Sequence, residues 1–344
     1  MKNSMKTRTV PKLSVMLSVA KNLSRCFVSL NMTLSLRAIV KQSLLAILIT
    51  SVPIVSANAV SFSSSTIDPA NAGYFTQIVV DSAGGKHAIY ATAIDSVRYS
   101  SAPANGSWGN FTTIFNGDCT TWISVAIDTT TVPNKLHLSA YNSTLGDLVY
   151  SSATIGASSI IWSSSTVNST NDVGGYSSIA LDSLGQPHIA YRDKTIAVLK
   201  YSSYSVTSGW QSYTVDDTPG TDSGLFTSIK INSAGLGHIV YGSWNGADYD
   251  LKIATKTAVG WSTSTIVSAG SMGAYCDLAI EPNGDMHVSY QDATTGNLKY
   301  IKRLAGIWQS EVVVDNSIGT GALWSSIGLD YNNKPHISYY DILN

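Results

Sequence analysis

The sequence predicts an all-β fold, a six-bladed β-propeller in which each blade is a four-stranded antiparallel sheet of about 50 residues. The main observation is that all six histidines of the 344-residue chain recur at intervals of 49 to 51 residues. They are His87, His137, His188, His238, His287 and His336. A second observation is that no segment after Ala59 has helical periodicity, whereas strand-like segments recur throughout. Six repeats of this length predict six blades.

The third copy of the repeat shows the four predicted strands in order. Residues 177–182 read SSIALD and residues 188–193 read HIAYRD, and both have the apolar or alternating pattern of strands. The intervening Ser-Leu-Gly-Gln-Pro is rich in turn-forming residues and predicts a tight hairpin. Residues 199–202 and 210–216 supply the third and fourth strands.

The other copies repeat this order. The first strand recurs at residues 76–81, 123–128, 227–232, 276–281 and 325–330. The fourth strand opens on a tryptophan in five copies, at Trp108, Trp162, Trp210, Trp261 and Trp308. We expect these tryptophans to pack each fourth strand on a neighbouring blade.

The two ends of the repeat array predict how the last blade is completed. Residues 61–68 resemble a fourth strand without its tryptophan, and the final copy stops after its second strand at Asp341. We expect the N-terminal strand to join the sixth blade, which then has an irregular or missing third strand. A sequence that ends early and a larger ring are the alternatives.

The first 59 residues have the features of a secretory signal. They contain eight Lys or Arg and no Asp or Glu, with an apolar run from Leu44 to Val55 and an A-x-A ending at Ala59. Met32 lies at a more usual distance from the apolar run than Met1, so residues 1–31 are a possible misassigned start. We expect residues 60–344 to form one propeller that is secreted or held at the cell surface. An uncleaved anchor is the alternative.

Charge narrows the range of partners. The chain has 21 basic and 22 acidic residues; removing the leader leaves 21 − 8 = 13 basic against 22 acidic residues, a net charge of −9. Nucleic acids and anionic lipids bind clustered Lys and Arg, so neither is an expected partner. We expect no membrane span after signal cleavage, and the oligomeric state is not predicted.

The repeat resembles two known propeller repeats. The run from SSIALD through HIAYRD to LKYS resembles NHL-type repeats, in which two strands ending in Asp flank a Gly-containing hairpin. It also resembles the BNR or Asp-box repeats of sialidase-like propellers, although this chain has Asp-x-x-Gly-x-x-His rather than Ser-x-Asp-x-Gly-x-x-Trp. The resemblance covers about residues 62–341 and implies blade geometry rather than a particular chemistry.

The histidines are predicted to be structural. The first strand ends in an acidic residue in five copies and in an asparagine in one: Asp81, Asp128, Asp182, Asn232, Glu281 and Asp330. We expect each imidazole to hydrogen-bond this side chain across the hairpin. A metal site is the alternative, but metal ligands must converge, whereas equivalent positions on six blades diverge.

An aromatic residue precedes the first strand in every copy, and these six are the predicted ligand-binding residues. They are Phe75, Trp122, Tyr176, Phe226, Tyr275 and Trp324. If the first strands are innermost, the six aromatics lie near a channel mouth, where they can stack on sugars. Packing between blades is the alternative role.

Two further residue sets bear on cofactors and disulfides. Asp193, Asp292 and Asp341 end three second strands and are weak candidates for a Ca²⁺ site, with turn capping as the alternative. We expect no other cofactor. Cys119 and Cys276 fall in the second and fifth blades, too far apart to pair, so we expect free thiols.

No recognised catalytic motif is present, so the sequence predicts a binding module for a carbohydrate or cell-surface polymer, without catalysis. The exported propeller, its acidic Ser/Thr-rich surface and its aromatic positions support this prediction. A sialidase-like or polysaccharide-cleaving enzyme is one alternative, although only Arg98, Arg192 and Arg303 remain for an arginine triad. An extracellular protein-interaction scaffold is the other.

Overall fold

The computed structural model describes residues 66–68, 72–92, 96–116, 121–156, 160–316 and 322–341. The predicted signal region and Cys119 lie outside the described residues. In the part that is described, every regular element is a β-strand, which confirms the all-β class. This part contains no helix long and apolar enough to cross a membrane.

The first four sheets each contain four antiparallel strands, paired in chain order. Blade 1 consists of β1 (Ala72–Val80), β2 (Lys86–Thr92), β3 (Ser96–Ala102) and β4 (Thr112–Asn116). Blade 2 consists of β5 (Thr121–Asp128), β6 (Lys135–Asn142), β7 (Asp147–Thr154) and β8 (Ser163–Asn168). Blade 3 consists of β9 (Val173–Leu181), β10 (Pro187–Asp193), β11 (Val198–Ser205) and β12 (Gly209–Asp216). Blade 4 consists of β13 (Asp222–Ile231), β14 (Gly237–Trp244), β15 (Tyr249–Thr257) and β16 (Gly260–Val267).

The last two sheets depart from this regularity. Blade 5 consists of β17 (Met272–Ile280), β18 (Met286–Asp292) and β19 (Leu298–Leu304), with a fourth strand interrupted into β20 (Ile307–Trp308) and β21 (Val312–Asp315). Blade 6 has two strands among the described residues, β22 (Ala322–Leu329) and β23 (Pro335–Asp341).

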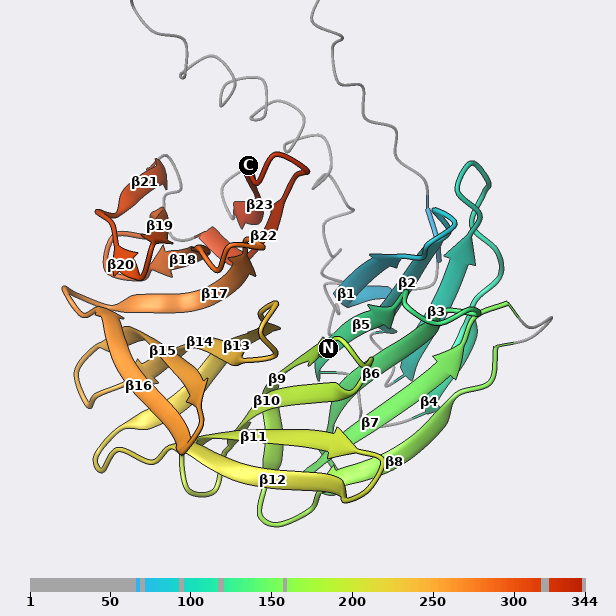
Figure 1. Ribbon diagram of the computed structural model, residues 1–344, viewed down its shortest axis with the longest axis horizontal. Helices are drawn as coiled ribbons and strands as arrows, with labels where there is room; N and C mark the ends of the chain where they lie inside the picture. Colours follow the sequence, from blue (N-terminus) through green and yellow to red (C-terminus); the bar gives the residue numbers. More distant parts are fainter. Residues whose placement is uncertain are drawn as a thin grey trace, which may run out of the picture. The chain divides into compact units, whose positions relative to one another are not determined.

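The first strands of successive sheets contact one another, from β1 with β5 through to β17 with β22. Figure 1 shows these first strands on the inside of the propeller and the fourth strands, such as β8, β12 and β16, on the outside. Six such sheets in chain order are the blades of the predicted six-bladed β-propeller.

Three of the five tryptophans join neighbouring blades as predicted. Trp162, Trp210 and Trp261 each pack edge-on against a tyrosine of the third strand in the preceding blade. The ring centroids lie 4.9 to 5.9 Å apart. The fourth strands begin later than predicted in blades 1 and 2, because Trp108 and Trp162 lie before β4 and β8 rather than inside them.

The predicted N-terminal strand at residues 61–68 lies mostly outside the described residues, but Asp68 is described. Its carboxylate accepts hydrogen bonds from Arg98 at 2.6 Å and from the Tyr90 hydroxyl at 3.3 Å. Asp216, which ends the fourth strand of blade 3, binds Lys252 and Tyr241 of blade 4 in the same way. Asp68 therefore contacts blade 1 in the same way that Asp216, at the end of a fourth strand, contacts the blade after it.

Candidate functional site

The six predicted aromatics occupy one backbone irregularity that recurs in every blade. In each case the aromatic and the residue after it form a β-bulge, two residues of the first strand facing one of the second. The aromatic has a φ between +48° and +54° at all six positions. The first strands therefore begin earlier than the sequence patterns predict, because each strand continues through its bulge.

This backbone conformation disfavours bulky side chains. The left-handed region costs a residue with a Cβ about 1 to 2 kcal/mol, and bulges of this kind ordinarily place glycine there. Glycine is absent from all six positions, and each holds Phe, Tyr or Trp. The ring must therefore contribute something that offsets the strain.

The bulge also links each blade to the next, through a hydrogen bond that does not involve the ring. The residue after an aromatic donates a side-chain hydrogen bond to the carbonyl of the preceding blade's aromatic. The pairs are Ser177 with Trp122, Thr227 with Tyr176, Cys276 with Phe226, and Ser325 with Tyr275. These bonds hold the bulges in register from blade 2 to blade 6.

The aromatic rings also contact one another. Trp122, Tyr176, Phe226, Tyr275 and Trp324 form a continuous series with consecutive ring centroids 4.5 to 5.4 Å apart, which we call the aromatic arc. Its middle members are half-buried, whereas Trp324 is 58% exposed. Phe75, the sixth bulge aromatic, is 37% exposed. The rings thus pack against each other and still present a surface to solvent.

Charged side chains flank the arc beside Trp122. Lys194 lies 5.9 Å from the Trp122 ring and 4.7 Å from the Tyr141 ring. Its ammonium binds the Asp172 carboxylate at 2.8 Å and the Tyr141 hydroxyl at 2.9 Å. Burial disfavours the charged form of Lys194, but the bonds to Asp172 and Tyr141 outweigh it and raise its pKa.

A second charged pair lies at the next junction, between blades 3 and 4. Arg192 holds Asp222 with two hydrogen bonds of 2.6 and 2.7 Å. Arg192 pairs across the sheet with Gly175, the residue before Tyr176, so this ion pair is next to the arc. At the far end, the Tyr340 ring lies 6.0 Å from Trp324. The arc is therefore bordered by groups that can donate and accept hydrogen bonds.

Five of the six histidines lie in buried or half-buried polar chains, whereas the His336 side chain is 63% exposed. His87 Nε2 lies 3.1 Å from Asp81 Oδ2 and its Nδ1 lies 2.8 Å from the Tyr99 hydroxyl. His287 repeats the arrangement with Glu281 and Tyr300, both at 2.7 Å. His188 and His336 lie 3.5 Å from Asp182 and Asp330. In blades 1 to 3, the tyrosine that contacts the histidine also packs on the tryptophan of the next blade; these tyrosines are Tyr99, Tyr150 and Tyr201. The histidines of these blades therefore link their hairpin to the neighbouring blade.

Among the described residues, two buried histidine Nε2 atoms lack the expected hydrogen bond. His137 Nε2 has no partner, because the longer hairpin lets Asp128 cap Thr130 and Thr131 instead. His188 Nε2 lies near Asp182 without a hydrogen bond. His238 Nε2 lies 3.0 Å from the Asn232 side chain, as predicted. Burial lowers the pKa of both His137 and His238 to about 4, so both imidazoles are neutral at physiological pH.

The candidate calcium ligands lie apart on three blades. Asp193 and Asp292 each cap the turn that follows, their Oδ1 atoms accepting two backbone N–H bonds. Asp341 is buried at the end of β23. Among the described residues, no three His, Cys, Asp or Glu side chains come together in a way that could hold a metal ion. Cys276 is a free, buried thiol, as predicted.

Comparison with known proteins places the chain among propellers by structure. No protein family and no curated protein matches the sequence. AofleA from Arthrobotrys oligospora superposes with a TM-score of 0.56 at 12% identity, covering 80% of this chain and 81% of that one. The fucose-recognising lectin of Aleuria aurantia, a six-bladed β-propeller, gives 0.56 at 11% identity and covers 80% and 91%.

An enzyme of the same architecture is also similar. A variant of the NanB sialidase from Streptococcus pneumoniae gives a TM-score of 0.55 at 11% identity, and the match covers 80% of this chain but only 66% of the sialidase. The chain is a six-bladed β-propeller. At such low identities the likeness concerns the fold, so function has to be argued from the residues.

Some neighbours of the arc could not be identified from the sequence. Tyr141, Arg192 and Lys194 come from second strands or the turns after them, and only the bulge register brings them beside the aromatics. One signal was available: the fifth residue of each predicted second strand varies, from Ala91 through Tyr141 and Arg192 to Tyr340. Variation at a fixed place in a regular repeat marks positions that the blade itself does not require.

Proposed function

We propose that this protein is an exported glycan-binding module and that the aromatic arc, with Phe75, is its binding surface. The observation that carries the proposal is the presence of an aromatic residue at a strained left-handed position in every blade. Six glycines would build the same bulges with less strain. The rings therefore contribute more than the bulge requires: they pack against one another, and we infer that their exposed faces bind the ligand.

The chemistry of the arc suits sugars. Aromatic rings offer rigid apolar faces for the C–H side of a pyranose. The Lys194–Asp172 pair and the Arg192–Asp222 pair beside Trp122 and Tyr176 supply donors and acceptors for hydroxyl groups. Sites that combine apolar contact with a few placed polar groups are typical of small-ligand recognition.

Two other observations support the proposal. The similar propellers include a lectin that recognises fucose. The basic leader with its apolar run favours export, where a carbohydrate or a cell-surface polymer is available as a ligand. N-terminal sequencing of the protein from culture medium tests export, and a chain that begins at or near Val60 is the expected result.

The main experiment compares binding and stability in the same variants. Trp324→Gly removes an exposed ring and relieves its strained φ, so we expect unchanged or higher stability together with lost binding on a glycan array. Trp122→Ala is expected to weaken binding as well. Tyr331→Ala is the matched control, because Tyr331 is 95% exposed in a hairpin remote from the bulges.

Three outcomes would contradict the proposal. Unfolding of Trp324→Gly would show that the ring serves packing. Full glycan binding by both tryptophan variants would exclude the arc as the binding surface. Release of sugar from a sialylated or acidic polysaccharide by the wild-type protein would make it an enzyme instead of a binding module.

A further inference from the structure

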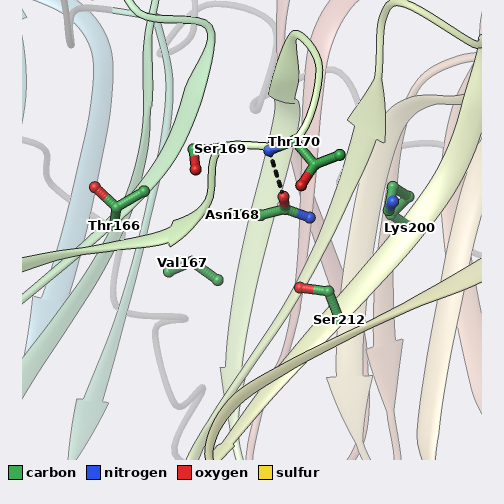
Figure 2. Close-up of a pocket in the computed structure, with 7 residues that line it drawn as sticks. All are labelled: Thr166, Val167, Asn168, Ser169, Thr170, Lys200 and Ser212. Atoms are coloured by element: carbon green, nitrogen blue, oxygen red, sulfur yellow. Dashed lines mark hydrogen bonds between the residues drawn. The ribbon is translucent and has the colours of Figure 1, made fainter.

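A pocket lies between the outer strands of blades 2 and 3, away from the aromatic arc. It has a volume of about 480 Å³ and is lined by the end of β8, the loop after it and two residues of blade 3. The lining residues are Thr166, Val167, Asn168, Ser169, Thr170, Lys200 and Ser212. Figure 2 shows hydroxyl groups on several sides of the space and Lys200 as its one charged group. A polar pocket with one cation is suited to a hydrated anion.

Comparison with the other blades explains why Lys200 is available. A cation occupies the same third-strand position in four blades, as Arg98, Lys200, Lys252 and Lys299. Arg98 and Lys252 each reach a carboxylate at 2.5 to 2.6 Å, and Lys299 reaches two at 3.1 and 3.3 Å. Among the described residues, the one carboxylate within 4 Å of the Lys200 ammonium is that of Asp193, at 3.9 Å.

The difference arises at one residue of the preceding blade. Asp216 ends β12 and binds Lys252, whereas the equivalent last residue of β8 is the neutral Asn168. Asn168 donates to the Tyr191 hydroxyl at 2.9 Å, which reverses the bond that Tyr241 donates to Asp216. The pocket therefore lies at the position equivalent to that of the Asp216 carboxylate at the junction of blades 3 and 4.

Asp193 does not fully replace that carboxylate. Its Oδ1 accepts the N–H groups of Thr195 and Ile196, and its Oδ2 accepts a hydrogen bond from Asn171 at 3.0 Å. The Lys200 side chain is only 15% exposed, so little water compensates its charge. A partly desolvated ammonium with no carboxylate in close contact gains most from an external anion.

We propose that this pocket binds the carboxylate or sulfate substituent of an acidic glycan, with Lys200 as the ion-pair partner. The hydroxyls of Thr166, Thr170 and Ser212 provide hydrogen bonds to the anion and to the sugar hydroxyls around it. The anion site follows from the junction alone, whereas its assignment to a glycan rests on the proposed function.

Calorimetric titration with a uronic-acid disaccharide, its neutral counterpart and sodium sulfate tests the proposal at constant ionic strength. Lys200→Met removes the cation and should weaken binding of the disaccharide and of sulfate by about ten- to a hundredfold. Asn168→Asp supplies the carboxylate found at the junction of blades 3 and 4, so it should abolish binding in a folded protein. Lys334→Met, at an exposed lysine, is the matched control and should bind normally.

The results separate this proposal from the function assigned to the arc. Unchanged affinity in Lys200→Met or in Asn168→Asp would overturn the anion site. Binding of sulfate without binding of the disaccharide would overturn the glycan assignment. If Trp324→Gly and Trp122→Ala both keep all binding of neutral glycans while Lys200 is still needed for the disaccharide, the arc proposal fails and the pocket stands.

Discussion

The junction between blades 3 and 4 depends on the buried Asp216 carboxylate, and Asp216→Asn tests how much. Asp216 Oδ2 accepts hydrogen bonds from Lys252 at 2.5 Å, from the Tyr241 hydroxyl at 2.7 Å and from Ser223 at 3.1 Å. Burial alone would raise the pKa of Asp216, but the bonds from Lys252, Thr218 and Tyr241 outweigh it and lower the pKa to about 2.

The expected loss can be worked out from this geometry. A carboxylate with a pKa of about 2 in the folded state and 3.8 when unfolded contributes about 2 kcal/mol at neutral pH. Because the folded pKa is the lower one, this stability is present above pH 4 and is lost as the pH falls toward 2. Asparagine also leaves the Lys252 charge buried without a partner, so the total cost should be about 3 to 5 kcal/mol.

Urea unfolding followed by tryptophan fluorescence measures this cost. With an m-value of about 3 kcal/mol/M, the midpoint of Asp216→Asn should fall by about 1 to 1.7 M. Adding Lys252→Met removes the orphaned charge and should restore most of the loss. A midpoint of Asp216→Asn within about 0.3 M of the wild type, or a double variant that is less stable than Asp216→Asn, would refute the argument.

Three further predictions concern single residues. Burial and the nearby Arg303 charge lower the pKa of His238, so the protein should lose stability as the pH drops from 6.5 toward 4, by about 2 kcal/mol at pH 5. The urea midpoints measured at pH 7 and pH 5 should therefore differ less for His238→Gln than for the wild type. Cys276→Ser should keep the hydrogen bond to the Phe226 carbonyl and lie within about 1 kcal/mol of the wild-type stability, whereas Cys276→Val should lose more stability. Equal urea midpoints for the two variants would show that the hydrogen bond is not needed. Gly273→Ala should cost more than about 2 kcal/mol, because its Cβ would lie 2.8 Å from Leu251 Cα at a φ of +86°, whereas Gly246→Ala meets no neighbour and should cost less.

The sequence predicted the architecture well because the repeat is regular. One residue type on a fixed period set the blade count and the order of strands, and the Asp-x-x-Gly-x-x-His turns located the hairpins. The strand starts were wrong by several residues, because an extended pattern read from SSIALD cannot reveal that Tyr176 and Ser177 form a bulge. Local alternation does not encode where a strand bends.

The surroundings of the candidate sites were beyond sequence analysis for a different reason. Lys252 takes its carboxylate from Asp216 of the preceding blade, 36 residues away in the chain, whereas Asn168 occupies the equivalent position 32 residues before Lys200. Only a comparison of aligned junctions shows that Asn168 stands where Asp216 stands one blade later. The six aromatics were found because each lies six residues before the end of its predicted first strand, although their left-handed backbone was not predicted.

The repeated junctions give this fold redundancy. When several interfaces share one design, a single interface can lose its ion pair without the loss of the whole ring, since the remaining interfaces still hold the blades in place. The junction of blades 2 and 3 has Asn168 where the next junction has Asp216, and a charged, hydroxyl-lined pocket lies there in place of the structural ion pair. In a tandem array, new recognition sites can therefore arise from the structural positions of a single copy.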